Sequence, residues 1–363
     1  MSSQELIVVD QAGATGLVAE KFRQVAHLMG IELGEVATAQ ADHVGNLLGD
    51  EDPTCPEQWA DKRLISLDDM ARGTGAPAVF SGLRTEEAAA YEDRFAAGRL
   101  VVTNSAANRM RDDVALVSAY VNSEHIDQLY ERDMPGRIIA GGNCFAAILT
   151  PVLAPLQRHI GITDIKVETL QGWSGTGARE VPVDVDDIKS MEGTPDGAEE
   201  RKKIQEEPNK MLGDTIDTPA TIGISAHPNR ARWLRGHQGL VTATLAQETN
   251  VREVQHLWRY RAPGELDAVR SQMKALSGLE GINWPHKHEP IKPVKLLHSE
   301  LVRYVPIKLL HSVLPMRTQA HLKDVSVSDP RDIVFEVAGD NLILGAVGGN
   351  LLNLLYARAK GYI

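Results

Sequence analysis

Residues 6–19, LIVVDQAGATGLVA, decide the fold of this 363-residue chain. The segment begins with Leu6-Ile7-Val8-Val9, an apolar and β-branched run that is typical of a buried parallel strand. Gly13 and Gly16 allow a tight turn, and the residues after Ala19 carry apolar side chains on one helical face. A strand, a glycine-rich turn and a helix in this order can hold a pyrophosphate on the N–H groups that open the helix. Because Ala19 replaces the third glycine of that pattern, a βα unit that binds no nucleotide is the open alternative.

The same alternation continues over the first half of the chain. Short apolar strands are predicted at residues 34–38, 78–81 and 100–103, and a helix is predicted at 86–97. Strands that alternate with helices predict an α/β fold with a Rossmann-like doubly wound parallel sheet.

The pattern changes from about residue 161. Residues 166–171 (KVETLQ) and 239–248 (GLVTATLAQE) alternate apolar and polar side chains, which is typical of half-exposed antiparallel strands. Residues 184–205 between them are rich in charge and turn formers, which predicts a solvated helix-and-loop excursion. The second part is therefore expected to be an α+β domain with a mixed or antiparallel sheet.

The end of the chain is predicted to return to the first domain. Residues 333–336 and 341–346 precede residues 348–360, a helix whose apolar side chains can pack on the first sheet. The expected domains are residues 1–143 with 335–363, for a dinucleotide, and residues 144–334.

Composition limits the classes of partner. Lys and Arg number 38 against 49 Asp and Glu, so the net charge is −11, which disfavours nucleic acid and anionic membrane surfaces. Two cysteines exclude a disulfide framework and a cysteine-rich metal cluster, and the N-terminal residues lack the pattern of a secretory signal. We expect a reducing, cytoplasmic location and no metal site.

One apolar stretch has the length of a membrane span. Residues 138–156 carry no charge, but they contain Gly141-Gly142-Asn143 and two prolines. A strand, a turn and a buried helix are therefore expected there. Two further motifs, the Trp284–His288 segment with its paired histidines and the string KLLHS at residues 295 and 308, are interpreted as an exposed loop and a coincidence or hairpin.

Cys144 is the sharpest candidate for chemistry. It follows Gly142-Asn143 and opens the apolar helix 145–149, so the helix N-terminus is expected to lower the pKa of its thiol. A buried structural cysteine is the alternative. His237, in the run LRGH, is a candidate acid or base for such a thiol.

The chain contains, in this order, GATGLV at 13–18, NSAANRMRDD at 104–113, Val121-Asn122, Asn143-Cys144, Leu170-Gln171, Ser174-Gly175, ERKK at 200–203, NKMLG at 209–213, Arg230 seven residues before His237, GAVGGNLLN at 345–353 and the terminal KGYI. The combination and order of these motifs resemble the aspartate-semialdehyde dehydrogenase family, most closely its archaeal and fungal branch.

The resemblance implies a role for each matching residue. Cys144 corresponds to the nucleophile, Gln171 to the residue that orients the thioester, and His237 to the acid/base. Arg230 would grip the substrate carboxylate and Glu200 its amino group. The phosphate would be bound by Arg109, Lys203 and Asn143. The dinucleotide would be held by Gly13, Ala14, Thr15, Gly16, Leu17, Val18, Thr38, Ser81, Ser174, Gly175 and Asn341.

The reaction implied is the reduction of an acyl phosphate, aspartyl phosphate, by NAD(P)H. The Cys144 thiolate would attack the acyl phosphate, and Arg109 and Lys203 would offset the charge of the departing phosphate. Hydride transfer to the thioester and collapse to the semialdehyde would follow, with His237 handling the proton. The resemblance also implies that the second domain is catalytic and forms a homodimer or homotetramer.

Departures from the family leave alternatives open. The usual Asn-Pro before Asn-Cys is Gly141-Gly142 here, Phe145 replaces a small polar residue, and Arg232 and Trp233 precede His237, so the pocket shape is expected to differ. Family resemblance favours NADP, but residues 38–45 (TAQADHVG) lack the cations that hold a 2′-phosphate, so NAD or both cofactors remain possible. A reductase of a malonyl-CoA-like thioester and a catalytically inactive nucleotide-binding protein are the competing functions.

Overall fold

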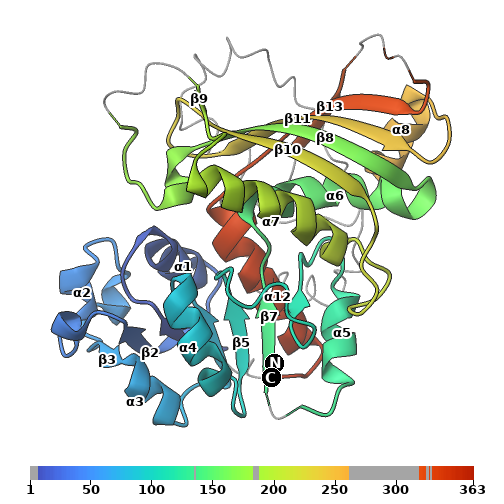
Figure 1. The fold of residues 1–363 in the computed structure, drawn as a ribbon. Coiled ribbons are helices and arrows are strands. Elements are labelled where there is room, and N and C mark those ends of the chain that lie inside the picture. The colour runs from blue at the N-terminus through green and yellow to red at the C-terminus, as the bar shows by residue number, and fades with distance from the viewer. Residues whose placement is uncertain (1–6, 135, 183–187, 261–318, 324–326, 328) are drawn as a thin grey trace.

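A computed structural model describes residues 7–134, 136–182, 188–260, 319–323, 327 and 329–363. The histidine pair at 286 and 288 and both KLLHS strings lie outside the described residues. The chain forms two units, each built on one sheet (Figure 1).

The first unit contains a seven-stranded sheet in which every pairing is parallel. The strand order is β3-β2-β1-β4-β5-β7-β6. The strands are β1 (Val8–Ala12), β2 (Glu32–Thr38), β3 (Ile65–Ser66), β4 (Ala78–Ser81), β5 (Leu100–Thr103), β6 (Ala115–Leu116) and β7 (Arg137–Ala140). The helices of this unit are α1 (Leu17–Leu28), α2 (Leu48–Glu51), α3 (Leu67–Arg72), α4 (Thr85–Phe95), α5 (Glu124–Tyr130) and α12 (Gly348–Ala359). The prediction of a doubly wound parallel sheet is confirmed.

The first strand of the chain differs from the prediction at its boundaries. The strand was expected over residues 6–9 but continues through Asp10 and Gln11, which are completely buried. They are tolerated because Asp10 accepts backbone N–H bonds from Glu35 (2.7 Å) and Ala76 (2.9 Å), and Gln11 bonds to Arg23 (2.9 Å).

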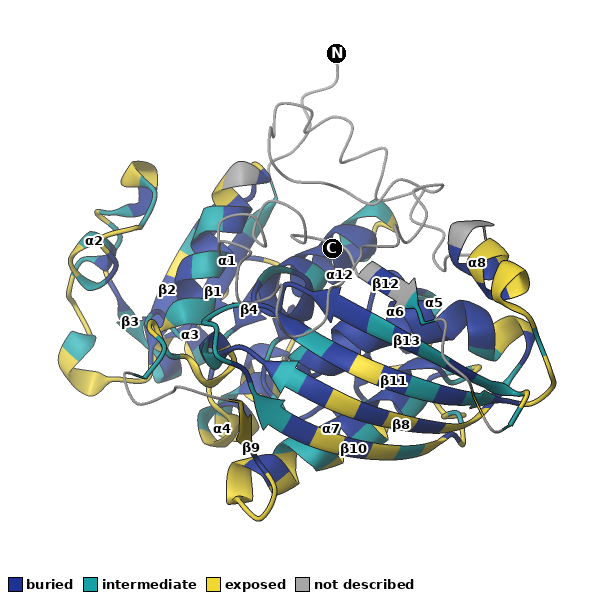
Figure 2. Ribbon diagram, turned by 90° about the horizontal axis from the view of Figure 1, so that it is seen from above, coloured by how far each residue is buried: buried dark blue, intermediate teal, exposed yellow. Residues whose placement is uncertain are grey.

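The second unit contains a six-stranded mixed sheet with the order β12-β13-β11-β8-β10-β9. Its strands are β8 (Ile162–Gln171), β9 (Lys189–Ser190), β10 (Gly223–Arg230), β11 (His237–Leu245), β12 (Gln319–Leu322) and β13 (Asp332–Gly339). All pairings are antiparallel except that of β8 with β10, which is parallel. Figure 2 shows buried and exposed residues alternating along β8, β10 and β11, as expected for a sheet with one covered face.

Helices α6 (Cys144–His159), α7 (Pro195–Met211) and α8 (Val251–Tyr260) belong to this unit. In Figure 1, α6 and α7 lie between the second sheet and the first unit. Most described residues within 184–205, interpreted as a solvated helix-and-loop excursion, are exposed, but α7 extends beyond this range and buries Ile204, Glu207 and Met211. Its high charge content conceals an inward face, because several of its charged side chains bond to other parts of the protein.

The uncharged stretch 138–156 forms part of β7, a turn and α6, as predicted. Pro151 and Pro155 lie inside α6. Among the described residues, the search for a helix long and apolar enough to cross a membrane finds none.

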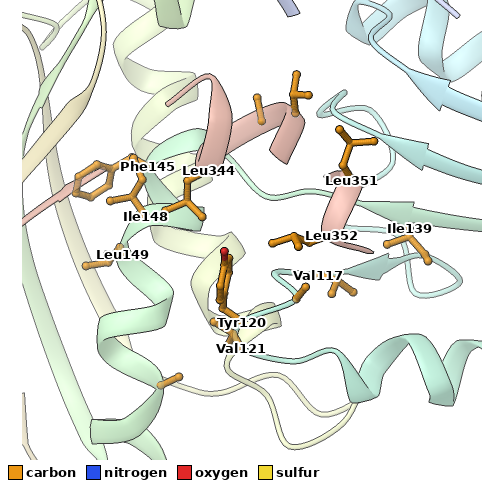
Figure 3. Packing of buried hydrophobic residues seen from close by; sticks show 14 of the residues in the cluster. Val117, Tyr120, Val121, Ile139, Phe145, Ile148, Leu149, Leu344, Leu351 and Leu352 are labelled. Atoms are coloured by element: carbon orange, nitrogen blue, oxygen red, sulfur yellow. The ribbon is translucent and has the colours of Figure 1, made fainter. Parts of the chain in front are cut away.

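The last residues of the chain connect the two units. After β13, residues Ile343–Val347 form one π-helical turn, η4, which continues into α12. The helix α12 packs on β5 and α1, and η4 packs on α1 and α6. Figure 3 shows side chains of α6, η4 and α12 in one cluster with Val117, Tyr120, Val121 and Ile139 of the first unit. One apolar core therefore runs from α6 into the first sheet.

Candidate active site

A cleft with a volume of about 250 Å³ lies at the carboxyl ends of the first sheet's strands and against α6, α7 and the second sheet. It brings together eleven of the residues proposed from sequence: Val18, Arg109, Asn143, Cys144, Gln171, Ser174, Gly175, Glu200, Lys203, Arg230 and Asn341. The sheet order reverses next to β1, between β1 and β4, and parallel α/β sheets bind ligands at such a switch point.

Cys144 is the first residue of α6, and Asn143 caps that helix. The Asn143 Oδ1 atom accepts the backbone N–H groups of Phe145 (3.0 Å) and Ala146 (3.2 Å). The two glycines before this cap are needed because a Cβ at Gly141 would lie 2.6 Å from Asn350 Oδ1 and one at Gly142 would lie 3.0 Å from a methionine methyl. The turn is thus tightly packed without the family's proline.

His237 is the first residue of β11, and its ring lies next to the Cys144 thiol. Its Nε2 atom is 3.0 Å from Cys144 Sγ, although the two residues are 93 positions apart in the chain. Its Nδ1 atom accepts the backbone N–H of Gly172 at 3.0 Å. The same N–H also lies 3.1 Å from the Gly236 carbonyl oxygen, so the neutral ring can carry its proton on either nitrogen. The imidazole is therefore fixed in position, with Nε2 facing the sulfur.

Both groups are neutral in the ligand-free protein. Burial raises the pKa of the Cys144 thiol to about 12, reinforced by the carboxylate of Glu200, and outweighs the opposing effect of Arg109 and Arg230. Burial also lowers the pKa of His237 to about 3. The expectation of a thiol pKa lowered by the helix N-terminus is wrong for this state, because desolvation of the thiolate is the larger effect.

Arg230, the last residue of β10, presents a half-buried cation to the cleft. Its Nη1 atom is shielded from solvent and has no hydrogen-bond partner among the described residues, and its guanidinium lies 5.9 Å from the Trp173 ring centre. A buried donor without a partner is costly, and a carboxylate would satisfy it in a bidentate arrangement. This is the strongest sign of an anionic ligand in the cleft.

Glu200 and Lys203 reach the cleft from α7. The Glu200 Oε1 atom accepts bonds from Asn143 Nδ2 (2.9 Å) and Gln171 Nε2 (2.8 Å), so three of the predicted residues form one network. Lys203 lies one turn further along α7, and its Nζ atom is 3.2 Å from Oε1 of the exposed Glu199. The Glu200 carboxylate, the amides of Asn143 and Gln171, and the Lys203 ammonium group therefore all line the cleft.

Sequence reasoning missed two further charged residues of α7, Glu207 and Lys210, which are 2% and 8% exposed. Glu207 pairs with Arg109, with 3.0 Å between Oε1 and Nη1, and its Oε2 accepts the backbone N–H of Asn143. Lys210 Nζ donates to the carbonyl oxygens of Arg109 (2.9 Å) and Arg111 (2.5 Å). Their helical spacing from Glu200 and Lys203 is the signal that could have revealed them.

The glycine-rich turn leads from β1 into α1. Gly13 and Gly16 have φ angles of +88° and +98°, which only glycine adopts readily. Gly16 caps α1 without any side-chain bond, so the first N–H groups of the helix are available to a ligand. Thr38 and Ser81, both buried, end the neighbouring strands β2 and β4. Ala14, Thr15 and Leu17 lie in the same turn or open the helix.

A buried network under this turn was also missed. Arg23 of α1 is fully buried and pairs with Asp52, with 2.7 Å between Nη2 and Oδ2. Its Nη1 atom donates to the Ala14 carbonyl and to Gln11 Oε1, both at 2.9 Å. A guanidinium therefore holds one carbonyl of the turn inward.

Asn341, Ser174 and Gly175 lie where the second sheet meets the first unit. Asn341 Oδ1 accepts the backbone N–H of Gly236 at 2.8 Å, and its Nδ2 donates to Ser174 Oγ at 3.0 Å. Gly175 is close to His237 and Arg230, since a Cβ there would lie 3.2 Å from the His237 ring and 3.6 Å from Arg230 Nη1. The contacts fix the segment that precedes His237.

The expected change of pocket shape does not follow from the three departures. Phe145 is fully buried and belongs to the apolar cluster of Figure 3. Its ring packs against Gly239 of β11. Neither Arg232 nor Trp233 lines the described cleft, and Trp233 Nε1 donates to the Gly236 carbonyl at 2.8 Å. The substituted side chains lie outside the cleft wall.

No group of three or more His, Cys, Asp or Glu side chains is placed to hold a metal ion in the described parts of the chain.

Comparison with known proteins gives a consistent result. Residues 9–129 match the family model "Semialdehyde dehydrogenase, NAD binding domain". The aspartate-semialdehyde dehydrogenase of Archaeoglobus fulgidus is 28% identical over 94% of this chain and 95% of its own length. That of Schizosaccharomyces pombe is 32% identical over 78% of this chain and 77% of its own. The crystal structure of the Candida albicans enzyme with NADP has the same fold, with a TM-score of 0.76 at 23% identity, covering 99% of this chain and 100% of that one.

Proposed function

The chain belongs to the aspartate-semialdehyde dehydrogenase family, and from this premise we propose that it reduces an acyl phosphate, aspartyl phosphate, to its semialdehyde with NAD(P)H. One observation carries the proposal. The thiol of Cys144 lies 3.0 Å from the His237 imidazole in a cleft that also contains the unpaired guanidinium of Arg230 and the cations of Arg109 and Lys203. A nucleophile with three cations is suited to a substrate that bears a carboxylate and a phosphate.

Each residue has a distinct task in this proposal. Arg230 binds the substrate carboxylate, and Glu200 binds its ammonium group. Arg109, Lys203 and the Asn143 amide bind the phosphate, whose departure they assist by offsetting its charge. Cys144 attacks the acyl carbon, and Gln171 orients the resulting thioester.

His237 handles the proton at Nε2. The neutral ring takes the thiol proton at Nε2 as the sulfur attacks, and Nε2–H then protonates the oxygen of the reduced thioester. When the thiohemiacetal releases the semialdehyde, Nε2 takes that proton back and passes it to the departing thiolate. A bound NAD(P)H supplies the hydride to the thioester carbon. Burial keeps the free thiol protonated, and an anionic ligand that excludes water would favour the same state. The thiol therefore loses its proton to His237 only as the sulfur attacks.

The turn at Gly13 and Gly16 fits a dinucleotide pyrophosphate, because its glycine conformations leave the N–H groups of α1 exposed. We propose Ala14, Thr15, Leu17, Val18, Thr38, Ser81, Ser174, Gly175 and Asn341 as its further contacts. After β2, however, residues 38–45 contain the 85%-exposed Asp42 and no Lys or Arg that could pair with a 2′-phosphate. We propose that NAD binds at least as tightly as NADP, which titrations of NADH and NADPH fluorescence would test.

A CoA-thioester reductase is the alternative. The network that Glu200 makes with Asn143 and Gln171 favours the acyl phosphate, because a simple diacid thioester has no ammonium group for that carboxylate. We further propose that residues 1–143 with 335–363 hold the nucleotide, and that residues 144–334 supply catalysis and the contact of a homodimer or homotetramer.

The test is NAD(P) reduction with aspartate semialdehyde, with inorganic phosphate and separately with CoA. Strict dependence on phosphate supports the proposal, dependence on CoA supports the alternative, and no reduction with either points to an inactive nucleotide-binding protein. Cys144→Ser should abolish turnover and leave nucleotide binding intact. The matched control is Cys55→Ser, because Cys55 lies outside the cleft lining. Full turnover by Cys144→Ser would refute the mechanism.

A further inference from the structure

We propose that Glu207 is a positioning residue, which acts through Arg109 to fix the phosphate-binding guanidinium relative to the turn that carries Cys144. The inference rests on the proposed function, because it concerns the same phosphate site. It begins from a carboxylate that the reaction itself does not use and that is only 2% exposed.

The two carboxylate oxygens of Glu207 face two different parts of the protein. Oε1 is 3.0 Å from Nη1 of Arg109, which comes from the loop after β5 of the first unit. Oε2 accepts the backbone N–H of Asn143, the cap of α6 and the residue before the nucleophile. One rigid side chain on α7 therefore ties the cation of the phosphate site to the backbone of the thiol.

Within the described residues, the other nitrogen atoms of the Arg109 side chain make only one further hydrogen bond, so the position of the guanidinium depends on its ion pair with Glu207. Nη2 donates to the Asn104 carbonyl at 2.8 Å, and Nε is buried and has no hydrogen-bond partner among the described residues. In the part of the chain that the structure describes, the guanidinium is held only by the Glu207 carboxylate and the Asn104 carbonyl oxygen. Arg109 also lines the cleft. Loss of the carboxylate would free the guanidinium to rotate and would leave its charge unpaired in a buried site.

A second contact from α7 holds the backbone of the loop that carries Arg109. Within this loop, only the Arg109 guanidinium therefore depends on Glu207. Lys210, one turn along, holds the carbonyl oxygens of Arg109 and Arg111. The loop backbone therefore stays anchored when residue 207 is changed, and the effect of such a change is confined to side-chain placement.

Glutamine cannot replace Glu207 without loss. Both oxygens of the carboxylate meet N–H donors, whereas a glutamine amide has only one oxygen and must turn its NH₂ group toward one of the two donors. Glu207→Gln therefore preserves volume while it breaks one of the two links. Glu206, its exposed neighbour on the same helix, offers the matched control Glu206→Gln.

The experiment measures the inorganic phosphate concentration that half-protects Cys144 from alkylation by iodoacetamide, followed by mass spectrometry. In Glu207→Gln it should rise about tenfold, as for the loss of one charge-assisted bond. It should stay within about twofold of wild type in Glu206→Gln. In an Arg109→Gln background, adding Glu207→Gln should change it by less than about twofold, because the residue then has nothing to act through.

Two outcomes overturn the inference. One is a folded Glu207→Gln protein with wild-type phosphate protection, and the other is an effect that adds in full to that of Arg109→Gln. If Glu207→Gln does not fold, Glu207→Asp, which keeps the charge but withdraws it by one methylene, must raise the half-protecting concentration about threefold or the inference fails. Absence of phosphate protection in the wild-type protein would instead refute the phosphate site of the proposed function, and the inference with it.

Discussion

Replacement of Arg23 by methionine should destabilise the protein and weaken nucleotide binding. The guanidinium is fully buried beneath the glycine-rich turn, where it pairs with Asp52 and holds the Ala14 carbonyl. Methionine fills much of the same volume but removes the charge and every donor. Asp52, which is 2% exposed, would keep only its bonds from Thr54.

The expected loss follows from these contacts. Removal of one partner from a buried ion pair costs about 3–5 kcal/mol, because the other charge stays buried without compensation. The exposed pair of Arg94 and Asp68, whose side chains are 45% and 50% exposed, provides the control. Arg94→Met should cost no more than about 1 kcal/mol.

Urea unfolding gives the free energy of unfolding, and titration of NADH fluorescence gives nucleotide affinity. Arg23→Met should weaken nucleotide binding by about fivefold to tenfold, as for one lost hydrogen bond that orders the turn. The double variant Arg23→Met with Asp52→Leu should recover most of the stability, since no charge remains buried. It should not recover nucleotide affinity, because the Ala14 carbonyl still lacks its donor. A loss of stability for Arg23→Met no larger than for Arg94→Met would refute this reasoning.

Three further outcomes are expected. Burial lowers the pKa of His237 to about 3 from 6.5, so the unfolded chain protonates first. The free energy of unfolding of wild type, relative to His237→Gln, should therefore fall between pH 6.5 and 3 by up to about 1.4 kcal/mol per pH unit; a constant difference in urea unfolding would contradict this. Because burial raises the pKa of Cys144 to about 12, its alkylation rate in the ligand-free protein should climb about tenfold per pH unit between pH 7 and 9, and a plateau there would show a preformed thiolate. Gly239→Ala should cost about 1–3 kcal/mol in urea unfolding, because the new Cβ would lie 2.5 Å from the Phe145 ring, and an unchanged midpoint would speak against that packing.

The first sheet could be predicted because its strands are short apolar runs and its first turn contains two glycines with positive φ angles. Boundaries were less certain for a physical reason. Asp10 and Gln11 read as a turn in the sequence, yet they extend β1 because buried partners from distant segments satisfy them. Partners such as Ala76 are not visible to a local pattern.

The site was only partly accessible to sequence reasoning. The 3.0 Å contact of Cys144 with His237 depends on the packing of α6 against β11, which no periodicity encodes. The strand β10, which ends in Arg230, escaped prediction because its sequence, GISAHPNR, is polar and contains a proline. The start of α7 was assigned to solvent because its charges outnumber its apolar side chains. The inward side of this helix nevertheless combines the charged Glu207 and Lys210 with the apolar Ile204 and Met211.

The inward face of α7 also limits how this segment can vary in length. Glu200, Lys203, Glu207 and Lys210 are three or four positions apart, so one side of the helix delivers all four to their partners. Insertion of a single residue after Lys203 would turn everything beyond it by about 100° and advance it by about 1.5 Å. Glu207 and Lys210 would then point away from Arg109 and the Asn143 backbone, while Glu200 stayed in place. Exposed positions of α7 are free to change identity, but the number of residues between the two halves of this face is fixed.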